Sequence, residues 1–261
     1  MPHRVKRSEP IFNVPPIVVA TLAAMAFVHA WRYFMLSSAE DLDFLINFAF
    51  IPARYDSMML PAGTFPGGFG AEIWTFVTYA FIHADLTHIG VNGVWLLAFG
   101  SAVARRFGPL RFLAFFAVTA AAGAAAHLVT HAGELVPMVG ASAAISGFMA
   151  AAVRFAFQRG GPLSMWRTQD DEAYRVPAVS LMAGLRDPRI LVFLVAWFGI
   201  NILFGVGTVA IPGAEQSIAW QAHIGGFIAG LVLFALFDPF TDTGGGEQQH
   251  NDEHMPEQTP Q

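Results

Sequence analysis

The chain has 261 residues, of which 55% are hydrophobic and only 13% are charged, and its net charge is −5. This composition excludes an ordinary soluble domain, because the apolar residues form blocks of about 20, the length that crosses about 30 Å of hydrocarbon. The chain has no cysteine, which excludes disulfides and thiolate metal sites.

The first predicted membrane span covers about residues 14–36 and follows a basic tail at residues 1–12. Such a start can be a signal peptide, but this apolar run is long and has no clear small-x-small cleavage site, so we interpret it as a transmembrane helix. Residues 37–71 are too polar and too interrupted by proline and glycine to span. Their apolar piece at residues 44–50 is predicted to lie in the membrane interface.

Five further spans are predicted, at about residues 83–103, 112–130, 138–157, 190–206 and 218–237. The charged loop at residues 158–188 has the character of soluble sequence, and the Gly-, Gln- and Glu-rich residues 239–261 are predicted to be disordered. We therefore predict an all-α polytopic membrane protein, with a six-transmembrane-helix bundle over residues 13–238.

The positive charges orient the predicted spans. Six spans place both termini on one side of the membrane, and Lys and Arg collect on the cytoplasmic side. Of the fourteen Lys and Arg residues only Arg32 and Arg54 fall on the opposite side, which leaves twelve on the side of the termini. We therefore expect a multi-pass protein of a bacterial inner (cell) membrane, with cytoplasmic N- and C-termini.

Three predicted spans that enter from the outer side carry polar residues to a similar depth. Ser142 lies about five residues into its span, roughly 7–8 Å, and His223 about six residues into its own, roughly 9 Å. The second span carries His88 and Asn92 through the same layer. Polar side chains inside a membrane are costly and face protein or water, so we expect these four to lie together.

The chemistry of these side chains predicts their roles. A serine hydroxyl is a weak nucleophile until a base takes its proton, and neutral imidazole is the commonest base. Ser142 as nucleophile and His223 as general base would form a dyad, although no carboxylate is evident to orient the histidine. His88 and Asn92 share a helix face and could donate hydrogen bonds to an oxyanion. His83 is a possible supporting residue.

Small residues predict how closely the helices approach. Gly226 and Gly230 follow His223 near the same helix face, and residues 140–147 around Ser142 are rich in glycine and alanine. In lipid, small residues on facing helices let two backbones come together. Gly140, two residues before the serine, is a further supporting candidate.

These residues resemble those of the rhomboid family of intramembrane serine proteases. The resemblance covers roughly residues 14–237 and rests on three motifs, namely His83-x4-His88-x3-Asn92, Gly140-Ala-Ser142 and Ala222-His223-x2-Gly226-x3-Gly230. It implies a six-helix core that cleaves single-span transmembrane proteins near the outer membrane face, with Ser142 as nucleophile, His223 as base, and His88 and Asn92 at the oxyanion. It implies the lipid bilayer as environment and no cofactor, metal or nucleic acid.

Two positions depart from the family pattern. The family's Gly-x-Ser-Gly reads Gly-Ala-Ser-Ala at residues 140–143, and Ser146 is a rival nucleophile one turn, about 6 Å, deeper. The family's Trp-Arg pair in the first loop reads Trp74-Thr75.

Simpler interpretations stand beside these predictions. A serine in a membrane helix usually bonds the carbonyl one turn back, which is the expectation for Ser146. His127 and His131 have a metal-ligand spacing, but only Glu134 is near them in sequence, so we predict no metal site. We interpret Asn201 as a helix–helix contact.

Other functions are less well supported by the sequence. A zinc protease would need His-Glu-x-x-His, and an aspartyl protease an aspartate pair within the spans; neither is present. A small-solute transporter would show internal repeats or a midplane site. The main alternative is a catalytically silent rhomboid-like protein that binds membrane clients.

Overall fold

The computed structural model describes residues 13–56, 61, 64–163, 171–205 and 219–240, and this part of the chain is helical, with an isolated bridge between Phe50 and Met138 as its one β-type pairing. The α-helices are α1 Pro16–Met35, α2 Ser38–Phe48, α3 Gly68–Thr78, α4 Leu86–Trp95, α5 Ser101–Phe107, α6 Pro109–Thr130, α7 Ser142–Val153, α8 Leu181–Gly184, α9 Pro188–Gly205 and α10 Trp220–Phe237. Short turns are η1 Pro52–Tyr55, η2 Tyr79–Phe81, the π-helical η3 Leu96–Gly100, and η4 Asp171–Tyr174.

Four helices in the described residues are long and apolar enough to cross a membrane: α1, the continuous helix α4–η3–α5, α6 and α10. The apolar α7 and the part of α9 up to Ile202 are shorter. The chain is thus an all-α, multi-pass membrane protein, as predicted. The count of six spans stays a prediction.

In two of the predicted spans the helix begins later than the first residue that we assigned to the span. The second starts at Leu86 rather than at residue 83, because the Asp85 side chain accepts a hydrogen bond from the His88 amide and caps the helix there. The fourth is helical only over Ser142–Val153, because the chain before it is extended and pairs at Met138 with Phe50. Ser142 is therefore the first residue of α7, while its depth in the membrane stays a prediction.

The short helix α7 forms the centre of the bundle. Every residue from Ala143 to Val153 is buried, which fits a helix that is apolar on all sides. Helices α6 and α10 pack most closely on α7 and on each other. Phe148 of α7 stacks on Phe112 of α6, with ring centroids 4.6 Å apart. Neighbouring helices therefore enclose α7 from Ala143 onward, while Ser142 at its start is half-buried.

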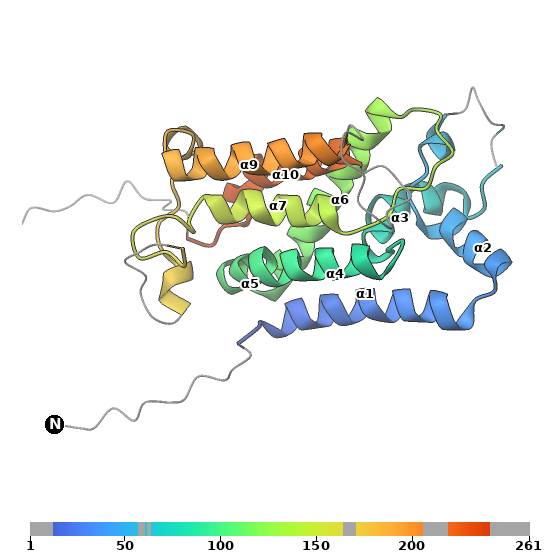
Figure 1. Cartoon of the computed structure of the whole chain (residues 1–261), viewed down its shortest axis with the longest axis horizontal. Coiled ribbons are helices and arrows are strands. Elements are labelled where there is room, and N and C mark those ends of the chain that lie inside the picture. The colour runs from blue at the N-terminus through green and yellow to red at the C-terminus, as the bar shows by residue number, and fades with distance from the viewer. Residues whose placement is uncertain (1–12, 57–60, 62–63, 164–170, 206–218, 241–261) are drawn as a thin grey trace, which may run out of the picture.

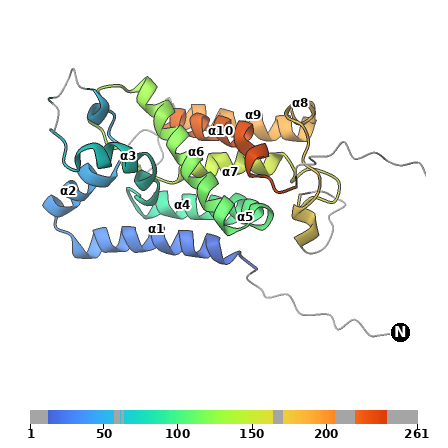
Figure 2. The same cartoon turned by 180° about the vertical axis from the view of Figure 1, so that it is seen from behind.

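The two ends of the bundle differ. Figures 1 and 2 show α2 and α3 gathered at one end, while η4 and α8 lie at the other. At the first end the Arg32 guanidinium pairs with Asp41 of α2, 2.7 Å from the carboxylate. Helix α2 starts at a capping box formed by Ser37 and Glu40. The predicted interfacial segment is therefore largely helical and folds back on α1.

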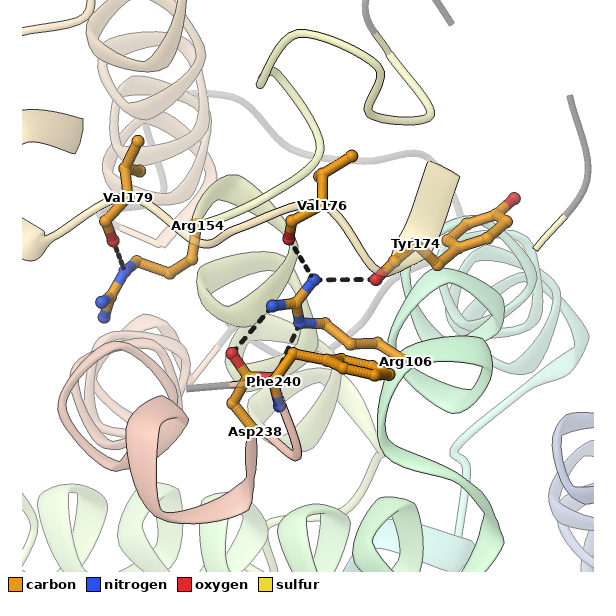
Figure 3. Close-up of polar contacts among 7 residues, drawn as sticks. All are labelled: Arg106, Arg154, Tyr174, Val176, Val179, Asp238 and Phe240. Atoms are coloured by element: carbon orange, nitrogen blue, oxygen red, sulfur yellow. Dashed lines mark hydrogen bonds and ion pairs between the residues drawn. The ribbon is translucent and has the colours of Figure 1, made fainter. Parts of the chain in front are cut away.

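A buried ion pair closes the opposite end, and Figure 3 shows its surroundings. The Arg106 guanidinium at the end of α5 makes two hydrogen bonds, 2.8 and 2.9 Å long, to the Asp238 carboxylate, and both side chains are fully buried. The same guanidinium donates to the carbonyls of Tyr174 and Val176. Arg154 donates to the Val179 carbonyl beside it. Two arginines therefore bind the backbone of residues 174–179 to the ends of α5, α7 and α10.

Candidate active site

The structure brings Ser142 and His223 into direct contact. The Ser142 Oγ atom lies 2.7 Å from the His223 Nε2 atom, which is hydrogen-bond distance. Ser142 is the first residue of α7 and His223 lies in the first turn of α10, so the starts of the two helices meet. The two residues are 81 positions apart in the sequence.

Glycines of α10 permit this approach. A Cβ atom added at Gly226 would lie 2.0 Å from the Ala143 carbonyl oxygen, and one added at Gly230 would lie 2.4 Å from the Gly147 carbonyl oxygen. No other residue fits at distances this short. The α10 backbone therefore touches the α7 backbone directly, which sets the distance between Ser142 and His223.

The third member of the site is Asn201 of α9, whose part here sequence reasoning missed. Its Oδ1 atom contacts the His223 Nδ1 atom, and its Nδ2 atom donates to the Trp197 carbonyl at 2.8 Å. The helix–helix contact that we expected of Asn201 is present, and what the sequence did not indicate is that its partner is His223. A polar residue in an apolar span indicated that Asn201 has a polar partner, but no local sequence pattern identified that partner.

Gly140 lies against His88, two residues before Ser142. The Gly140 φ angle is +115°, a conformation that L side chains rarely adopt, and its amide donates to the Tyr79 carbonyl. A Cβ atom at this position would lie 2.5 Å from the His88 Nε2 atom. Glycine is thus required twice, once for the backbone turn and once for the imidazole that lies against it.

The other predicted oxyanion residue, Asn92, is one turn further along α4. It is buried, and its Nδ2 atom donates to the His88 carbonyl at 3.0 Å. Among the described residues no hydrogen bond links Asn92 to Ser142 or His223. His88 thus lies against Gly140, whereas Asn92 bonds the backbone of His88 one turn further along α4.

His83 lies just before α4 and is fully buried. Its ring contacts that of His88 edge-on, with centroids 5.1 Å apart, and its carbonyl accepts a hydrogen bond from Arg32. Burial away from water lowers the pKa of His83 to about 3, so the ring is neutral at pH 7. Its contacts make it a neighbour of His88 rather than of Ser142.

The remaining candidates have local partners. The Ser146 hydroxyl donates to the Ser142 carbonyl at 2.7 Å, the usual bond of a serine in a membrane helix. The rings of His127 and His131 stack on each other with centroids 4.1 Å apart. In the part of the chain that the structure describes, no group of three His, Asp or Glu side chains could hold a metal ion.

Thr75, which replaces an arginine of the family pattern, is fully buried in α3. Its hydroxyl donates to the Ala71 carbonyl and lies 2.8 Å from the Tyr55 hydroxyl. A different arginine, Arg54, binds the nearby backbone through the carbonyls of Ile46 and Pro66.

The arrangement has the parts that acyl transfer needs. A hydroxyl lies against an imidazole that can take its proton, and the hydroxyl is on the first residue of a helix. The first amides of a helix have no intrahelical acceptor, and the positive end of the helix dipole favours an anion there. The first amides of α7 are therefore candidate donors to an oxyanion formed at Ser142.

The chain is similar in sequence to known proteins. The sequence model of the Rhomboid domain matches residues 70–239. Over 197 residues, 74% of this chain, the sequence is 24% identical to Rhomboid-like protease 3 of Toxoplasma gondii, covering 63% of that protein. It is 26% identical over 162 residues, 62% of this chain, to Rhomboid protease GlpG of Salmonella choleraesuis, covering 48% of that protein.

A third relative is RHOMBOID-like protein 12, mitochondrial, of Arabidopsis thaliana, which is 34% identical over 77 residues, 30% of this chain and 22% of that protein. The chain thus spans between 22% and 63% of the length of these relatives. The family model covers more than half of the chain and includes each motif residue around Ser142 and His223. The chain belongs to the rhomboid family.

Proposed function

We propose that this protein is an intramembrane serine endopeptidase that uses Ser142 and His223 as a catalytic dyad. The observation that carries the proposal is the 2.7 Å contact between the Ser142 Oγ and His223 Nε2 atoms at the meeting point of α7 and α10. Family membership and two relatives named as proteases support it.

The proposed reaction follows from this contact. The Ser142 Oγ atom attacks the scissile carbonyl carbon while His223 Nε2 takes the hydroxyl proton. The charge on the carbonyl oxygen is stabilised by amides in the first turn of α7 and by His88, with Asn92 as a further donor. His223 then gives its proton to the leaving amine, and water hydrolyses the acyl-enzyme.

We propose that the substrates are single-span transmembrane proteins cut near the outer membrane face. Because Lys and Arg collect on one side of the predicted spans, both termini would be cytoplasmic, in a bacterial inner membrane. The residues just before Ser142 bond to Phe50, which follows α2, and to Tyr79, which follows α3, and His223 contacts Ser142. The site therefore belongs to the end of the bundle that carries α2 and α3, the predicted outer end (Figure 1).

The proposal is tested by purified protein and a single-span model substrate in liposomes. We expect Ser142→Ala and His223→Ala each to reduce cleavage at least about a thousandfold, since the two act as one unit. Ser146→Ala is the matched control and should retain cleavage, because its hydroxyl only bonds a carbonyl. Loss of cleavage in Ser146→Ala but not in Ser142→Ala would reject the assignment.

The same assay separates the enzyme from the catalytically silent alternative. A client-binding protein would co-purify with the model substrate and leave it intact. Wild-type protein that binds this substrate without cleaving it, and is not labelled at Ser142 by a fluorophosphonate, would favour the silent protein.

A further inference from the structure

The His223 ring has a second hydrogen-bonding neighbour, on a helix that carries none of the predicted catalytic residues. Helix α9 presents Asn201 to the His223 Nδ1 atom, on the side of the ring opposite Ser142. Asn201 is only 7% exposed, so water does not readily substitute for it. In hydrocarbon two such polar groups find their partners in each other.

The orientation of the Asn201 amide follows from its other partner. The Trp197 carbonyl can only accept a hydrogen bond, so the amide group next to it is the Nδ2 donor. The Oδ1 acceptor therefore faces His223. An acceptor at this place requires a proton on Nδ1, and the Nε2 atom then carries the lone pair.

That tautomer is the one the proposed reaction needs. A lone pair on Nε2 accepts the Ser142 hydroxyl proton, whereas the opposite tautomer would present an N–H to the serine. We propose that Asn201 is a positioning residue that fixes the tautomer and ring orientation of His223; this inference rests on the proposed function. As a neutral amide, it does so without a charge in the apolar layer.

Aromatic packing holds Asn201 in place. The Trp197 ring, one turn earlier on α9, stacks on Phe227 of α10 with centroids 4.7 Å apart. Phe198 contacts the Phe227 ring edge-on. Asn201 lies one turn after Trp197 on α9, and His223 lies one turn before Phe227 on α10. The stacking of Trp197 on Phe227 therefore sets the register in which Asn201 meets His223.

Two substitutions of similar size separate positioning from packing. Asn201→Leu fills the space without an acceptor, and Asn201→Asp keeps an acceptor oxygen at the same position. If Asn201 only packs, Leu is tolerated and Asp, a buried charge, is the harmful change. If Asn201 positions His223, Asn201→Leu is the more harmful change and Asn201→Asp the less harmful one. Thr21→Val is the control, since the buried Thr21 hydroxyl bonds only the Ile17 carbonyl in α1.

The readouts are kcat and KM for a single-span model substrate in liposomes and the rate at which a fluorophosphonate labels Ser142. In labelling, the Ser142 oxygen bonds to phosphorus, fluoride leaves, and His223 accepts the hydroxyl proton. We expect Asn201→Leu to lower kcat and the labelling rate at least about tenfold, with KM changed less than about twofold. Asn201→Asp should be faster than Asn201→Leu, and Thr21→Val should match the wild type.

The inference is overturned if Asn201→Leu matches the wild type, or if Asn201→Asp is no faster than Asn201→Leu. Nitrogen-15 NMR of histidine-labelled protein tests it without any activity. The His223 signal, identified by its loss in His223→Ala, should show a protonated Nδ1 in the wild type and lose this preference in Asn201→Leu. A wild type that neither cleaves nor labels would refute the proposed function, and the NMR result would still decide the role of Asn201.

Discussion

At the scale of single residues, Ala143, which follows Ser142, has a close neighbour in α6. A Cβ atom added at Gly123 would lie 2.4 Å from the Ala143 Cβ atom and 2.8 Å from the Ala222 carbonyl oxygen. The absence of a side chain at residue 123 therefore leaves room for the methyl group that stands where the family pattern has glycine. Ala143 is accommodated by a neighbour 20 residues earlier in the chain.

This contact predicts a coupled pair of substitutions. We expect Gly123→Ala to destabilise the protein by about 1–3 kcal/mol through overpacking. Ala143→Gly in the same chain should restore part of that loss, with a coupling energy above about 0.5 kcal/mol. Thermal unfolding of the four variants in detergent measures the cycle.

Gly199→Ala supplies the matched control, since a Cβ atom there has nothing within 4 Å. It should be neutral or slightly stabilising, because alanine favours a helix over glycine. Strictly additive effects of Gly123→Ala and Ala143→Gly would contradict the proposed contact.

At the scale of helices and connections, the buried pair of Arg106 and Asp238 joins four segments. The pair links the end of α5 to the end of α10, and the carbonyls of Tyr174 and Val176 complete the guanidinium's hydrogen bonds (Figure 3). The Arg106 guanidinium also lies 4.7 Å from the centroid of the Phe155 ring. Arg106 therefore holds residues 174–176 against the bundle, next to Val179, which Arg154 binds.

We predict a large cost when this pair is broken. Asp238→Asn should destabilise the protein by about 3–5 kcal/mol, because it leaves the buried guanidinium without its counter-charge. Limited proteolysis should then cut within residues 174–179 sooner than in the wild type. Both effects are measured on purified protein in detergent.

The neighbouring pair of Arg105 and Asp171 is the control. Its contact is 2.6 Å long, but the Asp171 side chain is 63% exposed, so Asp171→Asn should cost less than about 1 kcal/mol. Equal losses of unfolding free energy in Asp171→Asn and Asp238→Asn would show that burial does not determine how much each ion pair contributes to stability.

At the scale of the whole molecule, the charged residues are segregated between the two ends of the bundle. Arg105, Arg106 and Arg154 act at the end that holds η4, and Arg32 and Arg54 at the end that holds α2 and α3 (Figure 1). Positive charge favours the cytoplasmic side, so the η4 end should face the cytoplasm.

Because the native chain has no cysteine, single substitutions report this orientation directly. Ala132→Cys, between α6 and α7, and Glu172→Cys, in η4, both replace exposed residues at opposite ends. In intact bacterial spheroplasts a membrane-impermeant maleimide should label Ala132→Cys and not Glu172→Cys. Both should react after detergent treatment. Labelling of Glu172→Cys before detergent would show that the topology is the reverse of the predicted one.

Much of the site could be predicted because its information is local. Apolar run lengths indicated the membrane helices, and spacing along one helix placed His88 and Asn92 on a common face. The glycines after His223 indicated a close helix contact, and the structure has α10 against the α7 backbone at Gly226. The sequence by itself thus determined the fold class and the candidate nucleophile and base.

Long-range contacts decided the rest. Ser142 begins α7 because Phe50 and Tyr79, far earlier in the chain, hold the extended residues before it. Asn201 meets His223, rather than any other neighbour, because the aromatic contact between α9 and α10 sets their register. Hydrophobic periodicity can be recognised within one helix. The hydrogen-bond partner of a polar side chain depends on which distant segment packs against it, and only the tertiary structure specifies that segment.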